Sequence, residues 1–145
     1  MAEISMKIAV DAPVEIMWSV VTDIERYPEF VKEVKEVRID SRAGSVITAT
    51  YTVELIKTVR YTLELDMSDW CKKVVWKMTT GDLMSKNDGG WEFEKRGEKR
   101  CEATYSADII FGSLIPGSIT NMLTEINLPR MVESFKKRAE TMAAG

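Results

Sequence analysis

The stretch TDIERYPEFV, residues 22–31, separates a helical sequence pattern from a strand pattern. The apolar residues before it recur at three- and four-residue spacing and predict an amphipathic helix: Ile16, Met17, Val20, Val21 and Ile24. Pro28 disfavours helical backbone angles at Tyr27, so we expect the helix to end there. Phe30 and Val31 follow at once, and these large apolar side chains should return the chain to the core. The stretch therefore predicts a turn that directs the chain and supplies no catalytic group.

The sequence on either side predicts the elements that this turn joins. Residues 3–10 alternate apolar and polar side chains, as expected for a strand with one buried face. Asp11 and Pro13 then give a helix-start signal. After the turn, a short second helix is expected at about residues 28–32, and a strand should follow over residues 34–39.

A long alternating segment forms the middle of the chain. Residues 46–67 alternate throughout, although strands usually contain only about 3–10 residues. The segment must therefore fold back on itself, and we expect the bend at Ile56 and Lys57. A turn at residues 41–45, in which Gly44 can take a positive φ, should precede it.

Three further strands are expected at residues 71–80, 89–96 and 99–111. The segment GDLMSKNDGG, residues 81–90, is rich in turn formers and should connect the first two. The sequence RGEK, residues 96–99, predicts a tight hairpin turn between the last two.

The final segment, about residues 118–143, carries an apolar stripe at helical spacing. Pro129 lies inside it and should produce a kink at which the stripe shifts phase. Strands followed by a helix indicate an α+β domain. We expect one domain over residues 1–145, with six to seven antiparallel strands curved around the long C-terminal helix and two short helices between the first and second strands.

Composition narrows the possible functions. The net charge of −3 gives no broad electrostatic reason to bind nucleic acid, and no apolar run approaches the roughly 18 residues of a membrane span. No signal-peptide core is found near Met1, so we expect a cytoplasmic protein. Cys71 and Cys101 lie outside any C-x-x-C motif and should be reduced thiols.

The chain contains no histidine, which is the commonest general acid or base near neutral pH. A Ser-His-Asp triad, a Cys-His pair and histidine-ligated zinc catalysis are therefore excluded. Catalysis would have to rely on carboxylates, lysines, tyrosines or water. We predict no cofactor, no metal site and no catalytic residue.

Three phrases of the sequence resemble a known family: VDAPVEIMWSVVTDIERYPEFVKEVKEVRI, WKMTTGDLMSKNDGGWEFEKRG and FKKRAE. They are similar to the polyketide cyclase/dehydrase and lipid-transport superfamily, and most similar to its coenzyme Q-binding and ribosome-association toxin branch. The most specific parts are the Tyr27-Pro28 turn after an apolar helix and the pair Trp91 and Phe93. The resemblance implies the START-like helix-grip fold, with an apolar cavity for lipids, quinones, sterols or polyketides between the sheet and the C-terminal helix.

The inward face of this fold predicts the residues that bind the ligand. Alternation selects side chains from the middle and later strands: Tyr51, Tyr61, Leu63, Leu65, Trp76, Met78, Trp91, Phe93, Tyr105 and Ile109. The C-terminal helix should close the cavity with Met122, Leu123 and Ile126. The alternative is that these side chains simply fill a core, and the pattern of large and small residues fits both interpretations.

Residues 109–119, IIFGSLIPGSI, place the apolar residues Leu114 and Ile115 between two glycines. An apolar loop tip predicts a lid over the cavity or a transient membrane contact through residues 112–117. The alternative is a hydrophobic contact that fixes the start of the helix.

Three functions are compatible with these patterns. The favoured one is non-catalytic binding or transport of a small hydrophobic ligand that is lipid-like, quinone-like or polyketide-like. The second is a polyketide cyclase or aromatase, in which the phenol groups of Tyr51, Tyr61 and Tyr105 contact the substrate. The third is a ribosome-associated interaction module, and the oligomeric state is left open.

Overall fold

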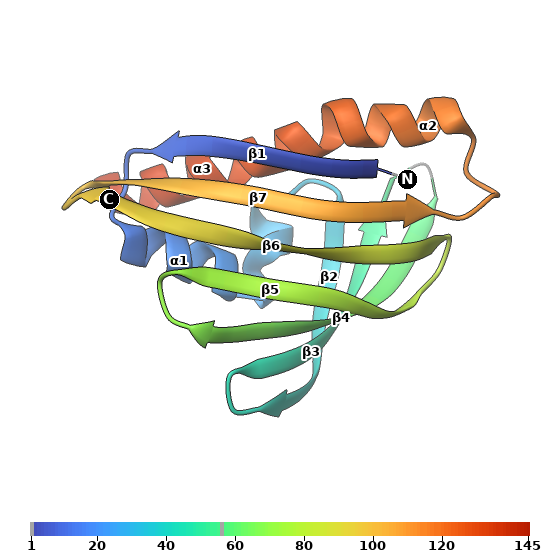
Figure 1. Cartoon of the computed structure of the whole chain (residues 1–145), viewed down its shortest axis with the longest axis horizontal. Coiled ribbons are helices and arrows are strands. Elements are labelled where there is room, and N and C mark those ends of the chain that lie inside the picture. Colours follow the sequence, from blue (N-terminus) through green and yellow to red (C-terminus); the bar gives the residue numbers. More distant parts are fainter. Residues whose placement is uncertain (1, 56) are drawn as a thin grey trace.

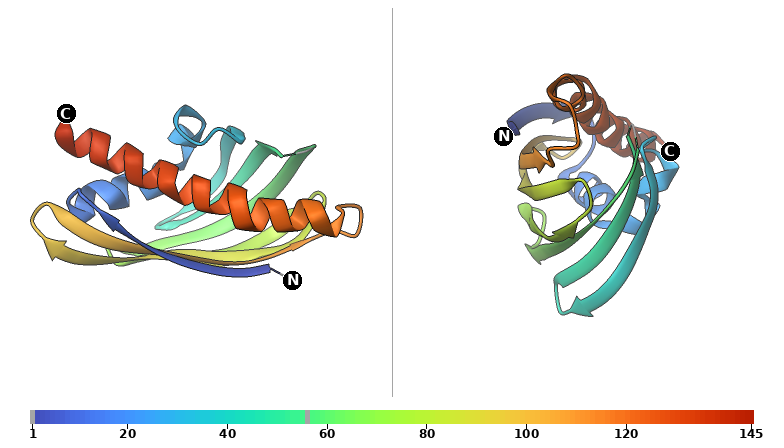
Figure 2. Two further views of the ribbon diagram at one scale, coloured as in Figure 1. Left: turned by 90° about the horizontal axis from the view of Figure 1, so that it is seen from above. Right: turned by 90° about the vertical axis from the view of Figure 1, so that its right-hand side faces the viewer.

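Seven strands form one antiparallel sheet that curves around a long helical segment (Figures 1 and 2). The computed structural model describes residues 2–55 and 57–145. In spatial order the strands are β1 (Ala2–Val10), β7 (Arg100–Phe111), β6 (Met84–Gly97), β5 (Lys73–Gly81), β4 (Thr58–Asp69), β3 (Val46–Glu54) and β2 (Val34–Ala43). The expected α+β helix-grip architecture is confirmed.

The sheet buries alternate residues, as the sequence pattern predicts. In β7 the inward residues are all buried: Cys101, Ala103, Tyr105, Ala107 and Ile109. The turn at Gly44 has the expected positive φ of 63°. The fold-back expected at Ile56 and Lys57 agrees with the end of β3 at Glu54 and the start of β4 at Thr58, although Ile56 itself lies outside the described residues.

The first helical region differs from the expectation. Helix α1 (Val14–Thr22) ends at Asp23, whose φ and ψ of −85° and 68° leave the helical region. The 3₁₀ helix η1 (Ile24–Glu29) then contains Tyr27 and Pro28, so the break expected at Pro28 is wrong. The expected second short helix is present, but it lies at residues 24–29 instead of 28–32.

Proline is accommodated in η1 because of its place in a turn. The Tyr27 carbonyl accepts hydrogen bonds from the backbone N–H groups of Phe30 and Val31, at 3.1 and 2.8 Å. Pro28 is the second residue of this turn, where its fixed φ fits and its missing N–H is not needed. Val31 is buried and Phe30 half-buried, so both residues return to the core as expected.

The segment 81–90 is mostly strand rather than turn. Strand β6 begins at Met84, and the turn needs only Asp82 and Leu83, whose φ is 55°. Gly89 and Gly90 lie within β6, at a place where the backbone of the two neighbouring strands approaches closely. A Cβ atom on Gly89 would lie 2.2 Å from the Ser106 carbonyl oxygen, so the missing side chains allow the strands to pack here.

The C-terminal helical segment runs without interruption through α2 (Gly117–Met122), η2 (Leu123–Asn127) and α3 (Leu128–Ala144). The irregularity expected at Pro129 is present but lies in the preceding turn. There, η2 is π-helical and the Leu128 N–H donates to the Leu123 carbonyl. Because proline lacks an N–H and crowds the carbonyl four residues earlier, the wider turn relieves this conflict.

Helix α3 is held against the sheet by an aromatic cluster centred on Phe135. The Phe135 ring lies 5.0 Å from Tyr27, 5.1 Å from Phe30 and 5.2 Å from Trp91, measured between ring centroids. Phe135 is 2% exposed. The cluster therefore joins α3, η1 and β6 through one buried side chain.

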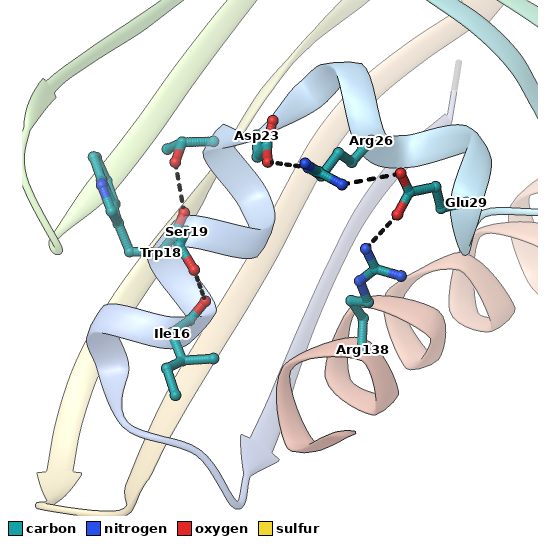
Figure 3. A network of polar contacts seen from close by, with 8 residues as sticks. Ile16, Trp18, Ser19, Asp23, Arg26, Glu29 and Arg138 are labelled. Carbon is teal, nitrogen blue, oxygen red and sulfur yellow. Dashed lines mark hydrogen bonds and ion pairs between the residues drawn. The ribbon is translucent and has the colours of Figure 1, made fainter. Parts of the chain in front are cut away.

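A series of ion pairs runs along the exposed side of the same contact (Figure 3). Arg138 Nη2 lies 2.5 Å from Glu29 Oε1, and Glu29 Oε2 lies 3.2 Å from Arg26 Nη1. Arg26 Nε in turn lies 3.0 Å from Asp23 Oδ2. The Arg138 guanidinium also lies over the Phe30 ring, 5.1 Å from its centroid.

Replacing Phe135 by alanine should lower the free energy of unfolding by about 3–5 kcal/mol, because a buried aromatic ring is lost and a cavity remains. Chemical denaturation followed by circular dichroism measures the change. Met142→Ala on the same helix is the control, since Met142 is 47% exposed, and it should change stability little. A similar loss for both variants would contradict the central role of Phe135.

The Glu29–Arg138 pair should make stability depend on pH. The hydrogen bond from Arg138 holds the pKa of Glu29 below its ordinary value. The pair therefore stabilises the fold above the ordinary glutamate pKa, and this contribution is lost as pH falls through the lowered folded value. At pH 7 the melting temperature of the wild-type protein should exceed that of Glu29→Gln by a small margin, because the pair is exposed. The two melting temperatures should converge as pH falls from the ordinary glutamate pKa through the lowered folded value.

Arg138→Gln provides the matching test of this pH effect. Glu29→Gln in the Arg138→Gln background should produce a smaller pH-dependent change in melting temperature, because only the pair with Arg26 remains. A pH dependence of undiminished size in that background would show that Arg138 does not carry the effect.

Candidate functional site

Two adjoining cavities lie between the concave face of the sheet and the C-terminal helical segment. The central cavity has a volume of about 70 Å³ and lies beneath Phe135 and Met131. The distal cavity has a volume of about 100 Å³ and lies nearer to Leu123 and Leu128. Both are lined by the same six residues: Val31, Val34, Tyr61, Asn87, Tyr105 and Met131. The shared residues make the two cavities neighbouring compartments of one site.

Aromatic rings enclose the central cavity. Tyr51 stacks on Tyr61 with 5.2 Å between centroids and 10° between planes, and Tyr51 is also 6.4 Å from Tyr27. On the opposite strands, Tyr105 lies 5.3 Å from Trp91 and 5.8 Å from Trp76. Phe135 connects the two sides through Tyr27 and Trp91. The wall is therefore continuous, apolar and rich in large flat rings.

Apart from Glu33 at the edge of the distal cavity, the polar side chains of the cavities are neutral. Burial raises the pKa values of Tyr51, Tyr61 and Tyr105 above the ordinary phenol value, so their hydroxyl groups stay protonated. Asn87 is 7% exposed, and its Oδ1 accepts a hydrogen bond of 3.2 Å from Trp76 Nε1. Among the described residues, no lysine or arginine lines either cavity.

A polar contact closes the edge of the distal cavity. Asn127 Nδ2 donates to Glu33 Oε2 at 3.1 Å, and both residues line this cavity. The bond joins the loop before β2 to the π-helical turn η2. Since Glu33 is the one charged residue on the described cavity lining, charge is confined to this edge.

Most residues predicted from the sheet lie where the sequence placed them. The central cavity is lined by Tyr51, Tyr61, Leu63, Leu65, Trp76, Trp91 and Tyr105, and the distal cavity adds Ile109. Phe93 is buried but packs edge-on against Trp18 of α1, 5.8 Å away, so it does not reach the site. Met78 is half-buried and lines neither cavity; its Sδ lies 2.7 Å from the position a Cβ on Gly81 would take.

The helical and loop residues were predicted less well. Leu123 is 4% exposed and lines the distal cavity, whereas Ile126 is 50% exposed and Met122 lines neither cavity. The π-helical turn rotates the later positions, which explains why simple helical spacing was wrong for Ile126.

The loop before α2 does not line the cavities. Leu114 is 78% exposed, so it does not fix the start of the helix by packing, whereas Ile115 is half-buried. Neither residue lines the two cavities, and a lid or membrane contact through residues 112–117 stays a prediction. None of the helices described is both long and apolar enough to cross a membrane.

Sequence reasoning missed lining residues from the turns, from the helical segment and from several strands. The missed lining residues are Tyr27, Val31, Glu33, Val34, Val53, Leu55, Met84, Asn87, Phe111, Asn127, Leu128, Met131 and Phe135. Asn87 was hidden because its segment resembled a turn. The stripe on α3 contained Leu128 and Phe135, which was a usable signal for them.

A much larger hollow of about 860 Å³ lies on the outer face of the sheet. It is a solvent-exposed trough over Gly89 and Gly90, bordered by Glu3, Lys73 and Glu92. It is open to solvent and bordered by charged side chains, so it does not enclose an apolar ligand. We therefore place the candidate site on the concave side.

The described residues offer little chemistry beyond hydrogen bonding. They contain no group of three or more cysteine, aspartate or glutamate side chains that could hold a metal ion. Burial raises the pKa of Cys101 to about 11, and it also raises that of Cys71, so both thiols stay protonated at neutral pH. The site can enclose an apolar molecule and hydrogen-bond to it.

Solved structures share this fold over nearly the whole chain. A START superfamily protein from Mycobacterium smegmatis superimposes with a TM-score of 0.86 at 19% identity, covering 98% of this chain and 99% of that one. The Zhui aromatase/cyclase from Streptomyces sp. R1128 superimposes with a TM-score of 0.82 at 16% identity, covering 98% of this chain and 93% of that one. A protein from Thermus thermophilus superimposes with a TM-score of 0.80 at 22% identity, covering 98% of this chain and 97% of that one.

Sequence comparison gives a more specific result than the fold. No curated protein matches the sequence. A family model does match, over residues 10–136, and it describes polyketide cyclase / dehydrase and lipid transport proteins. The matched range contains the Tyr27-Pro28 turn, all seven predicted residues of the central cavity and the first part of α3, including Phe135. The chain belongs to the polyketide cyclase / dehydrase and lipid transport family.

Proposed function

We propose that this protein binds or carries a small, neutral, hydrophobic ligand without transforming it. The observation that carries the proposal is the pair of adjoining apolar cavities, whose polar groups are uncharged except at the Glu33 edge. Family membership supports a hydrophobic ligand. Ligand pockets are typically apolar with a few placed polar groups, as found here.

The cavity volumes limit the ligand or require movement. Each cavity is smaller than the apolar cavity of about 150 Å³ that holds benzene. Both are also well below the roughly 300–1,000 Å³ of pockets for drug-sized ligands. A single-ring ligand therefore needs the two compartments joined. Met131 and Tyr61 lie between them, and the flexible methionine side chain can move at low energetic cost.

A larger ligand, such as a lipid or a polyketide, requires the helical cover to shift. The Asn127–Glu33 bond is a single polar contact at the edge of that cover. The adjoining π-helical turn already departs from regular hydrogen bonding. Opening at η2 would join the distal cavity to solvent while the Phe135 cluster keeps α3 attached.

Cyclase or aromatase activity is the second candidate, and the family description favours it. The neutral phenols of Tyr61 and Tyr105 could donate hydrogen bonds to a substrate carbonyl. A base that removes a proton is also needed, and Glu33, at the edge of the distal cavity, is the one carboxylate on the described lining. The ribosome-associated role rests on the sequence resemblance alone.

A ligand should be retained by the purified protein. Native mass spectrometry should show a stoichiometric added mass, and solvent extraction should release a neutral apolar compound. Val34→Phe should abolish the added mass, because Val34 lines both cavities and a larger side chain would fill them. Val75→Phe is the matched control, since Val75 is 48% exposed on the outer face. Retention of the ligand by a folded Val34→Phe variant would contradict the proposed site.

The non-catalytic proposal predicts that the protein does not accelerate cyclisation of a trial polyketone. Product formation should equal that of the protein-free control when it is followed by liquid chromatography. Turnover that disappears in Tyr51→Phe, Tyr61→Phe or Tyr105→Phe would instead establish the cyclase function.

A further inference from the structure

Apart from the aromatic residues and Cys101, Asn87 is the only buried residue with a polar side chain among the described residues. It lies in β6 and lines both cavities, at their shared boundary with Tyr61 and Tyr105. A buried amide is costly unless its donors and acceptor are paired. Its orientation and its partners therefore indicate what the site is built to bind.

The Trp76 indole fixes the orientation of the Asn87 amide. An indole N–H can only donate a hydrogen bond, so the atom that faces Trp76 Nε1 at 3.2 Å must be Oδ1. The Nδ2 group then points away from Trp76. Among the described residues Nδ2 has no acceptor within hydrogen-bond distance, so two N–H donors are left for the cavity.

The backbone around Asn87 explains how this side chain reaches the cavity. Strands β5 and β6 pair only from Lys73 to Trp76 on one side and from Gly89 to Glu92 on the other. Beyond that point Asp88 Oδ1 accepts a hydrogen bond of 3.1 Å from the Met78 N–H, in place of a strand-to-strand bond. The strands separate here, and Asn87 occupies the space on the concave side.

Two phenol groups add further hydrogen-bond donors beside Asn87. Tyr61 and Tyr105 line both cavities with Asn87, and their hydroxyls have no protein partner among the described residues. In contrast, the Tyr27 hydroxyl donates to the Val21 carbonyl and is already satisfied. A ligand atom at the boundary of the two cavities therefore meets several N–H and O–H donors and no cation.

We infer that the site selects a compact apolar ligand with a neutral carbonyl oxygen, such as an aromatic ketone or a quinone, held by the Asn87 Nδ2 group. Trp76 acts as a positioning residue that keeps the donor side of Asn87 toward the ligand. A carboxylate ligand is disfavoured because no lysine or arginine of the described lining would neutralise it. The inference rests on the proposed function, since it names the ligand class of the same cavities.

Two probe ligands of nearly equal shape distinguish the contribution of a carbonyl group to binding from that of the apolar ring. Acetophenone carries a carbonyl oxygen, and α-methylstyrene carries a CH₂ group at the same place. Asn87→Leu should weaken acetophenone binding by roughly 3- to 10-fold, the amount expected for one lost hydrogen bond. The same substitution should leave the affinity for α-methylstyrene unchanged or increase it. Ligand titrations followed by NMR give both dissociation constants.

The wild-type protein gives a second readout that does not depend on a variant folding. In ¹H–¹⁵N spectra, the Asn87 side-chain amide protons should move downfield with acetophenone and much less with α-methylstyrene. In Trp76→Phe the amide can rotate, so this movement should shrink. The ratio of the two affinities should then move toward the Asn87→Leu value.

The outcomes distinguish this inference from the proposed function. Equal effects of Asn87→Leu on both probes, or no movement of the Asn87 amide signal on acetophenone binding, would overturn the carbonyl selection and leave the cavity function standing. Failure of both probes to bind the wild-type protein would overturn the proposed function together with the inference.

Discussion

The contact between Phe135 and the rings of Tyr27, Phe30 and Trp91 is the interaction on which the rest of the structure depends. It attaches the C-terminal helix to the turn after α1 and to the centre of the sheet. Without it, the concave face would lose its cover, and a curved sheet with one apolar face is not stable in water by itself. The ion pairs from Asp23 to Arg138 border the same contact but are exposed, so they contribute less.

The local structure of strand β6 explains the position of the polar group in the site. Gly89 and Gly90 let β6 approach its neighbours closely, and β5 separates from β6 beside them. That separation brings Asn87 to the concave side, where Trp76 orients its amide. The polar group at the centre of the site is thus a consequence of how the strands bend. The surrounding rings make the site apolar around that group.

The sequence predicted the strands and the sheet side of the cavity well because a strand alternates with a period of two. Tyr51, Leu63, Trp76 and Tyr105 followed directly from that period. Prediction from the sequence pattern failed where the local conformation departs from regular helix or strand geometry. Ile126 was misplaced by a π-helical turn, and Asn87 was overlooked because Gly89 and Gly90 resemble turn residues although they lie in a strand.

The Tyr27-Pro28 turn gave both a correct prediction and a wrong one. Sequence resemblance to the helix-grip family was correct, whereas the helix boundary was wrong because proline fits the second position of a turn inside η1. The coenzyme Q-binding branch and the identity of the ligand stay predictions, since spacing in one sequence does not define a cavity volume.

A crystal structure of the protein soaked with acetophenone would show directly whether the concave cavities bind a carbonyl ligand. We expect a ring between Tyr61, Tyr105 and Met131, with the carbonyl oxygen about 2.7–3.2 Å from Asn87 Nδ2. Acetophenone bound only on the outer face of the sheet, or cavities that remain closed and empty at saturating ligand, would contradict it.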